Sequence, residues 1–283
     1  YYLCEQIKID ENRLNIKESY EDVLSTNIAD CGYLLEFDSK EDNDTKYTTS
    51  NGIPVKFKDD AIAGTSLYTA VSQKVQNIEN YLDAGNYTEA YKMLDINSVI
   101  DQWLILELTM NREYGDPGSV YMFMDGDGKL CSGPVWDFDR GTFQNQEKAK
   151  SLGNSDRIKA DNEWMCWRSA ETYIWYKQLI KDKTFQETVK ARWAVIKPYL
   201  DMIPDVIRYY GESQAVSYTY DSKMWPTNKA DIQRFKYDFS DWSGDETFGA
   251  NGNYQEVIDN FVTVYTERLA GMNTLITSGK FTK

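Results

Sequence analysis

The spacing of apolar residues changes along the chain from the period of a strand to the period of a helix. Up to about residue 60, short apolar runs are separated by Gly, Asn and Asp, which is typical of strands joined by turns. After Thr65, apolar side chains recur every three or four residues, at Leu67, Val71, Val75, Ile78 and Leu82. We therefore expect an α+β fold, with a small β-rich N-terminal part and a larger, mainly helical remainder.

Strands are predicted in the first part at residues 2–9, 32–37 and 54–58, with a hairpin turn across Thr49–Ile53. The first long helix ends at Gly85, and a second begins near Ser98, where Ser98 and Asp101 form a capping-box-like pair, and runs to Asn111. Further helices are predicted at 171–180, at 184–199 after a Thr184/Glu187 capping box, at 204–220 and at 254–276.

A second hairpin is predicted between these helical segments. Residues 119–124 and 129–136 read as strands around the turn Asp125–Gly128, and the second strand leads into Asp137-Phe-Asp139. The turn lacks the bidentate Glu of an EF-hand, because Trp136 stands at the twelfth loop position. Residues 142–163 and 225–252 read as long polar loops.

Composition excludes several classes of function. The chain has 31 basic and 45 acidic side chains, a net charge of -14, which argues against a nucleic-acid partner. No apolar run is long enough for a transmembrane segment. Histidine is absent, which excludes Ser-His-Asp hydrolases and His-ligated zinc enzymes. Catalysis would have to use carboxylates, Lys, Tyr, Ser, Cys or a metal held by oxygen ligands.

The sequence bears on the start of the chain and on the pairing of its cysteines. The chain starts at Tyr1 without an initiator Met, so we expect a fragment or a trimmed mature form. Four cysteines are present, Cys4, Cys31, Cys131 and Cys166, and their spacing does not decide whether any pair forms a disulfide.

Asp137 and Asp139 are the leading candidates for a metal site. In an extended segment alternate side chains share a face, so the two carboxylates are expected to converge on one cation. Asn111, Glu113 and Asp116 add oxygen ligands of the kind that Mg²⁺ or Mn²⁺ prefers. The alternative is that the two carboxylates cap a strand end and bind water or Arg140.

The order of these segments resembles the catalytic half of a protein kinase. There, a loop carboxylate receives the substrate hydroxyl and a later Asp holds magnesium. The helical period places Glu107 on the buried side of its helix. There it is either the partner of a buried ion pair or a residue at the edge of that side, in contact with solvent. Lys56 and Lys58 are expected on one side of a strand. Either side chain would contact a phosphate of a bound ligand, or both are exposed to solvent without a functional role.

Blocks of residues along nearly the whole chain resemble the CotH kinase family. They are Tyr2-Leu-Cys-Glu-Gln-Ile7, Asn12-Arg-Leu-Asn-Ile16, Gly32-Tyr-Leu-Leu-Glu-Phe-Asp38, Pro54-Val-Lys-Phe-Lys58, Glu107-Leu-Thr-Met-Asn111, Ser119-Val-Tyr-Met122 and Gly133-Pro-Val-Trp-Asp-Phe-Asp139, with Phe185, Arg192-Trp193 and Trp225 in the helical half. The run at 133–139 after the Glu-Leu-Thr-x-Asn block is the most specific of these.

The resemblance implies an atypical protein-kinase-like fold as a single domain over 1–283. A partial N-terminal lobe would cover 1–62 and a helical lobe 63–283, with the catalytic hairpin at 119–139. It implies ATP and Mg²⁺ or Mn²⁺ as cofactors, and phosphorylation of Ser or Thr in secreted or coat proteins. The location would be extracellular or at the cell or spore surface. The oligomeric state stays open.

The resemblance also suggests roles for individual residues. Asp137 and Asp139 would hold the metal, and Asn111 would assist them. Glu113 or Asp116 would orient the acceptor hydroxyl. Glu5 and Ile7 would lie at the edge of the adenine pocket of the cofactor site, and Lys58 would contact a phosphate of the cofactor.

Two departures from the family pattern are visible. Many members have Asn-x-Asp where this chain has Asn111-Arg112-Glu113. The family's first strands and the helix that follow a kinase's glycine-rich region are expected to precede Tyr1. The missing strands favour one alternative, a non-catalytic binding or assembly module on a kinase-like scaffold. The aromatic content of 14%, with 21 Tyr and 8 Trp, leaves a second alternative, a secreted carbohydrate-active enzyme that uses two carboxylates as acid and base.

Overall fold

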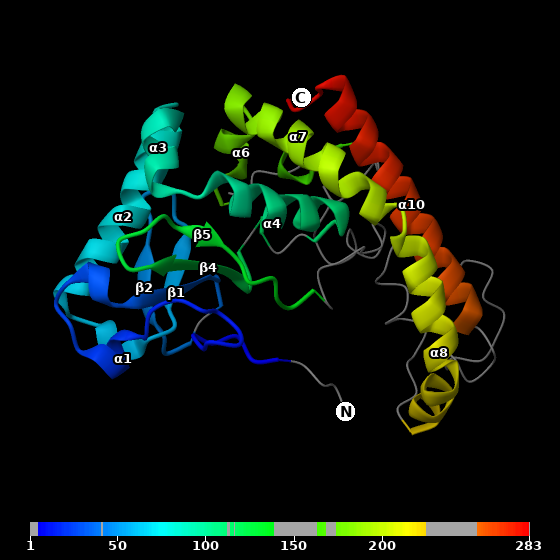
Figure 1. Ribbon diagram of the computed structural model, residues 1–283, viewed down its shortest axis with the longest axis horizontal. Coiled ribbons are helices and arrows are strands. Elements are labelled where there is room, and N and C mark those ends of the chain that lie inside the picture. The colour runs from blue at the N-terminus through cyan, green and yellow to red at the C-terminus, as the bar shows by residue number, and fades with distance from the viewer. Residues whose placement is uncertain are drawn as a thin grey trace. The chain divides into compact units, whose positions relative to one another are not determined.

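The computed structural model describes residues 5–40, 42–111, 114–115, 117–138, 163–167, 174–224 and 254–282 (Figure 1). The chain divides into two compact units. The first comprises Tyr1–Leu106, Arg112–Arg140 and Ala170–Gln186. The second comprises Glu107–Asn111, Gly141–Ser169 and Glu187–Lys283. Helix α4 (Ile96–Leu108) contributes residues to both units.

The first unit contains a five-stranded antiparallel sheet in the order β2-β3-β1-β4-β5. The strands are β1 (Gly32–Phe37), β2 (Thr45–Thr48), β3 (Pro54–Phe57), β4 (Val120–Asp125) and β5 (Cys131–Ser132). Both predicted hairpins are confirmed. Their turns contain Gly52 and Gly126 at φ values of 80° and 59°, which glycine adopts without steric cost. The second strand of the later hairpin is much shorter than predicted.

The later hairpin lies in the same sheet as the strands of residues 32–57. All six residues of β1 pair with β4, from Gly32 opposite Asp125 to Phe37 opposite Val120. The resemblance to the CotH kinase family implies a helical lobe over 63–283 that includes this hairpin. Backbone pairing places it in the same compact unit as the strands of residues 32–57. The lobe boundary near residue 62 stays a prediction. The assignment of the whole chain to one domain stays a prediction.

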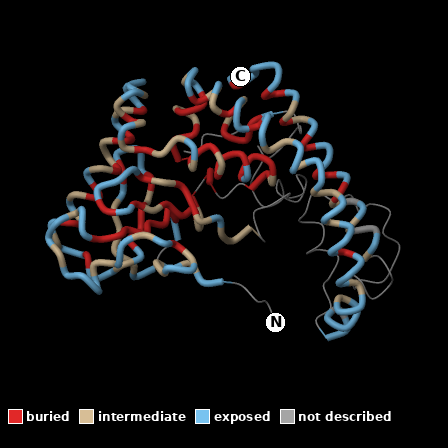
Figure 2. Tube along the Cα trace, in the orientation of Figure 1, coloured by how far each residue is buried: buried red, intermediate tan, exposed pale blue. Residues whose placement is uncertain are grey.

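One face of the sheet forms the apolar core of the first unit. Leu35, Phe37, Val55 and Phe57 are at most 2% exposed. This face packs against helix α2 (Ser66–Asp83), where the Phe57 and Tyr68 rings lie 5.0 Å apart, and against Trp175, 5.6 Å from Phe37. Figure 2 shows the buried residues concentrated along the strands and α4.

Helix α2 confirms the helical period read from the sequence. Its buried apolar side chains are those predicted: Leu67, Val71, Val75, Ile78 and Leu82. Thr65 caps the first turn by accepting a hydrogen bond from the Tyr68 amide at 3.3 Å. Gly85 follows the helix with φ of 68°, as expected at a C-terminal cap.

Two predicted helix starts were displaced. Helix α4 begins at Ile96, and the Asp95 carboxylate accepts from the Ser98 amide at 2.8 Å, so Ser98 lies inside the helix. Helix α7 (Lys183–Leu200) begins after Asp182, which accepts from the Phe185 amide at 2.9 Å. In both cases an Asp is the N-terminal cap, and the proposed Ser98/Asp101 and Thr184/Glu187 boxes were wrong.

Other elements differ from the prediction in extent. Residues 5–9 form no strand and make only a bridge between Ile9 and Leu14. Helix α3 (Tyr87–Met93) was not predicted, and the helix expected at 171–180 has only α6 (Tyr176–Leu179) among its described residues. Short helical segments also occur at Tyr20–Val23 (α1), Ile28–Asp30, Asp60–Ile62 and Met165–Trp167. The predicted loops at 142–163 and 225–252 lie almost entirely outside the described residues.

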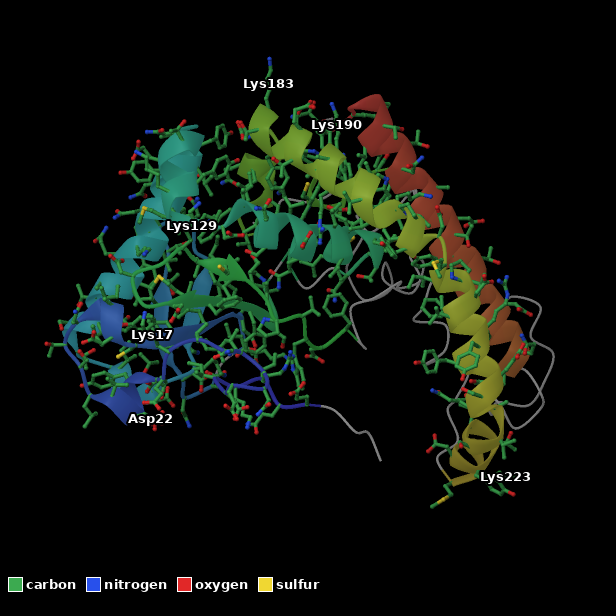
Figure 3. All side chains as sticks on the ribbon, viewed as in Figure 1. Lys17, Asp22, Lys129, Lys183, Lys190 and Lys223 are labelled. Carbon is green, nitrogen blue, oxygen red and sulfur yellow. The ribbon has the colours of Figure 1, made fainter. Side chains whose placement is uncertain are left out.

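The second unit is helical. Helices α8 (Ile203–Met224) and α10 (Tyr254–Ser278) confirm the two predicted C-terminal helices and lie side by side (Figure 1). The Tyr218 and Tyr254 rings stack 4.4 Å apart between them. The Trp193 indole of α7 donates to Asn273 of α10 at 3.0 Å. The ammonium of Lys190, labelled in Figure 3, lies 5.9 Å from the centre of the Phe281 ring.

Membrane spans and disulfides were searched in the described part of the chain. No helix there is both long and apolar enough to cross a membrane. Cys31, Cys131 and Cys166 are free thiols, and Cys4 lies outside the described residues.

We predict that Ile78→Ala lowers the free energy of unfolding by about 2–5 kcal/mol, because the Ile78 side chain of α2 is fully buried and its truncation leaves a cavity. Urea denaturation measures the change. Gln73→Ala, at an exposed position of the same helix, is the control and should change stability by no more than about 0.5 kcal/mol. Equal effects at both positions would contradict the assigned helix face.

Candidate functional site

The second face of the sheet carries charged side chains that are paired with one another. Lys58 lies 3.0 Å from Glu36 and 2.7 Å from Asp44. Lys56 is 1% exposed and forms ion pairs with Asp38, at 3.4 Å, and with Asp42. Burial alone would lower the pKa of Lys58, but its hydrogen bonds to Asp44 and Glu36 raise the pKa well above its usual range. Lys58 is therefore a cation held in place by carboxylates.

An apolar cluster lies on the same sheet face beside this charged group. It is built around Leu14, Leu34 and Tyr121 and includes the partly buried Ile7, Ile9, Ile16, Phe123 and Trp136. Tyr121 joins the two groups, because it lies opposite Glu36 in the β1–β4 pairing. The predicted cofactor residues Ile7 and Lys58 thus lie on one face of one unit. Glu5 is more exposed, and its carboxylate lies 3.5 Å from Arg13.

Asp137 follows Trp136 directly and departs from the extended conformation assumed in the sequence analysis. Its φ of 59° is in the left-handed region, which is uncommon for Asp. The side-chain alternation that would align Asp137 with Asp139 therefore does not apply, and that part of the reasoning was wrong. The Asp137 carboxylate accepts a hydrogen bond from the Ser119 hydroxyl at 3.2 Å. Asp139 lies outside the described residues.

Two oxygen donors of the kind that a hard divalent cation binds lie at Asp137. Asp137 is half-buried, and its carboxylate and the Ser119 hydroxyl supply oxygen atoms, the ligands that Mg²⁺ prefers. In the described ranges, no group of three or more His, Cys, Asp or Glu side chains gathers into a ready-made metal site. A metal here would need further oxygen ligands, and Asp139 is the nearest candidate in the sequence.

The predicted catalytic residues are only partly described. Asn111 is 1% exposed and belongs to the second unit. Glu113 and Asp116 lie outside the described residues, as does Arg112. Their proposed roles therefore stay predictions.

Glu107 is a fully buried ion-pair partner, one of the two roles that its position in the helix allowed. Its carboxylate lies 2.9 Å from the guanidinium of Arg268, which is also fully buried. The same carboxylate accepts the amides of Met165 at 2.9 Å and Cys166 at 3.4 Å. A charge taken out of water requires this kind of compensation. Arg268, some 160 positions away in the sequence, gave no sign of its role.

Sequence reasoning also missed Glu36 and Tyr121. Glu36 is a charged residue within an otherwise apolar strand, and it is 6% exposed. A charged residue at such a position is rarely buried without a partner, so it was the available signal. Tyr121 could be found only from the pairing of β1 with β4, which the sequence does not reveal.

Comparison with known families identifies the chain. The sequence model described as CotH kinase protein matches residues 1–272 of the 283. The chain belongs to the CotH kinase family. This confirms the resemblance seen in the sequence, and the α+β architecture agrees with a kinase-like fold. No curated protein and no solved structure matches the chain.

We predict that Tyr121 makes this CotH-family protein less stable at alkaline pH. Burial, and then the neighbouring Glu36 carboxylate, raise the pKa of the Tyr121 phenol above its usual value of 10.0. The stability that Tyr121 contributes is complete below about pH 10 and is lost as the pH rises toward the folded-state pKa.

The free energy of unfolding, measured by urea denaturation between pH 8 and 11, should fall less steeply for Tyr121→Phe than for the parent. Tyr209→Phe is the control, because the Tyr209 side chain is 67% exposed and belongs to the second unit. Parallel curves for the parent and Tyr121→Phe would refute the prediction.

Proposed function

We propose that this CotH-family protein is an atypical protein kinase that transfers the γ-phosphate of ATP to Ser or Thr residues of secreted or coat proteins. The observation that carries the proposal is the arrangement on one sheet face. A carboxylate-held lysine, Lys58, stands next to an apolar cluster that includes Ile7 and Trp136, and Asp137 follows Trp136 directly. A nucleotide needs all three kinds of group: a cation for phosphate, an apolar surface for the base and an acidic metal ligand.

Each group would have a defined part in binding. Ile7 and Trp136 would line the base, with Glu5 at the edge of the pocket. Lys58 would donate to a phosphate oxygen while Glu36 keeps its ammonium oriented, as an acidic partner does for the phosphate-binding lysine of protein kinases. Tyr121, opposite Glu36, would limit the movement of that carboxylate.

Asp137 and Asp139 would hold Mg²⁺ or Mn²⁺. Such an ion, when bound, supplies positive charge that neutralises the phosphates and stabilises the charge developing in phosphoryl transfer. The Ser119 hydroxyl, by donating to Asp137, would orient that carboxylate. We assign Asn111 an assisting role, and Glu113 or Asp116 the orientation of the acceptor hydroxyl. These assignments are supported by the family resemblance.

The proposed setting follows from the same family. A CotH-type kinase would act outside the cell or at the cell or spore surface, on secreted or coat proteins. The net charge of -14 favours acceptor segments that carry basic residues, because they are attracted to the protein at low ionic strength.

A non-catalytic binding or assembly module is the second candidate. The observation that favours it is the Glu at position 113, where many family members have Asp. Such a module would keep the kinase-like scaffold and bind partners without transferring phosphate. Radiolabel transfer from ATP distinguishes the two candidates.

We predict that Asp137→Asn and Asp139→Asn each reduce label transfer from ATP to casein or to the protein itself by roughly 10²-fold or more, since each removes a ligand charge from the metal. The longest natural form of the protein is used, with Mg²⁺ or Mn²⁺ at millimolar concentration. Asp127→Asn, in the exposed hairpin turn, is the matched control and should retain parental activity. Equal labelling by the parent and both site variants would sink the kinase proposal, and a parent without activity would favour the binding module.

A second prediction concerns the nucleotide alone. Lys58→Met should weaken ATP binding in isothermal titration calorimetry by roughly tenfold to a hundredfold, the value of one charge-assisted hydrogen bond. Lys129→Met, at an exposed position on the hairpin of the same unit, should leave the affinity unchanged. An unchanged affinity in Lys58→Met would remove Lys58 from the site.

A further inference from the structure

The turn that follows α4 determines where Asn111 lies. After the helix ends at Leu108, Met110 adopts φ of 53°, in the left-handed region, and its amide donates to the Glu107 carbonyl at 3.2 Å. The next residue, Asn111, is 1% exposed. A change in this turn would move the Asn111 side chain.

Arg268 binds this turn from α10. Its Nε donates to the Glu107 carbonyl at 2.9 Å, the same oxygen that accepts the Met110 amide. Its Nη2 donates to the Glu107 carboxylate at 2.9 Å, and its Nη1 to the Glu163 carbonyl at 2.8 Å. One guanidinium thus joins the end of α4 to the described residues 163–167.

These contacts go beyond what neutralising Glu107 would require. A carbonyl at the end of a helix has lost its partner within the helix, and here Arg268 supplies the donor. The planar guanidinium presents its donors in a fixed geometry, so three acceptors on two segments are held in one arrangement. The Met165 and Cys166 amides donate to the Glu107 carboxylate and complete this set of hydrogen bonds.

We propose that Arg268 is a positioning residue for Asn111 in phosphoryl transfer, acting through the turn over residues 107–110. The inference rests on the proposed kinase function and on the assisting role given there to Asn111. Reaction rates are sensitive to displacements of about 1 Å in a catalytic group, so loosening this turn should slow transfer more than it weakens nucleotide binding.

Arg268→Lys is the test variant, because it keeps the charge beside Glu107 but has a single nitrogen in place of the fork. We expect kcat for label transfer to fall at least tenfold, with the KM for ATP changed less than twofold. Hydrogen exchange at the Met110, Met165 and Cys166 amides should become faster in the same variant.

Trp193→Phe is the control for lost stability. It breaks a partly buried side-chain hydrogen bond between α7 and α10, in the same unit. It should lower the melting temperature while leaving kcat and the three amides unchanged. If its kcat falls as far as that of Arg268→Lys, general destabilisation explains both and the positioning role is overturned.

Glu107→Gln provides a second variant in case Arg268→Lys does not fold. It removes the charge of the pair but leaves the backbone carbonyl that binds Arg268 Nε. The Met110 amide should then stay protected, and loss of that protection would overturn the inference.

The two proposals fail in different ways. A parent that transfers no phosphate contradicts the kinase function, while exchange at the Met110 amide still decides whether Arg268 fixes the turn. An active parent whose Arg268→Lys variant keeps more than half of its kcat contradicts the positioning role alone.

Discussion

The pairing of β1 with β4 determines most of what the first unit presents. It joins strands that are almost ninety residues apart in the sequence along six consecutive residue pairs. Because side chains alternate across a strand, this one register sends Leu35, Phe37 and Met122 into the core. It also places Glu36 beside Tyr121 on the opposite face. A shift of one residue would exchange the two faces and dismantle both the core and the charged group.

Buried carboxylates are compensated in two different ways. Glu79 of α2 is fully buried and accepts hydrogen bonds from the Asn51 amide, the Gln76 side chain and the Trp175 indole, all of them neutral donors. Glu107 has a guanidinium in addition to its amide donors. Both carboxylates accept hydrogen bonds from segments that are distant in the sequence. Because a buried charge is costly without such partners, these hydrogen bonds also hold the loops that supply the donors in place. Glu79 does this for the β2–β3 turn, and Glu107 for Met165 and Cys166.

Local signals were sufficient where structure depends on neighbours in the sequence. The spacing from Leu67 to Leu82 and the glycines of both hairpin turns predicted α2 and the strand pairs correctly. Local signals were insufficient where two nearby residues could each cap the start of the same helix. Asp95 and Asp182 each stood just ahead of a plausible Ser or Thr cap, and the carboxylates became the caps. Helix α3 was missed because its seven residues bury only Ala90 fully and give no clear period.

Residues of the candidate site could be selected from the sequence, but their arrangement in space could not. Ile7 and Lys58 were chosen from the sequence and lie on one sheet face, whereas their neighbours Glu36 and Tyr121 were not chosen. That proximity depends on long-range pairing, which no local pattern encodes. Asp137 shows the opposite case. The residue was chosen for its chemistry, but a left-handed backbone at that position invalidated the geometry inferred from regular strand alternation.

The last residues of the described chain are bound by two tryptophans. The Trp164 indole donates to the Lys280 carbonyl at 2.7 Å, and the Trp167 indole donates to the Phe281 carbonyl at 2.9 Å. Trp164 also stacks on the Phe281 ring, with centroids 5.8 Å apart. Indole emission depends on hydrogen bonding and on contact with water, so these two side chains form a built-in optical reporter. Because they are two of the eight tryptophans in the chain, release of the C-terminal residues would change part of the total tryptophan emission.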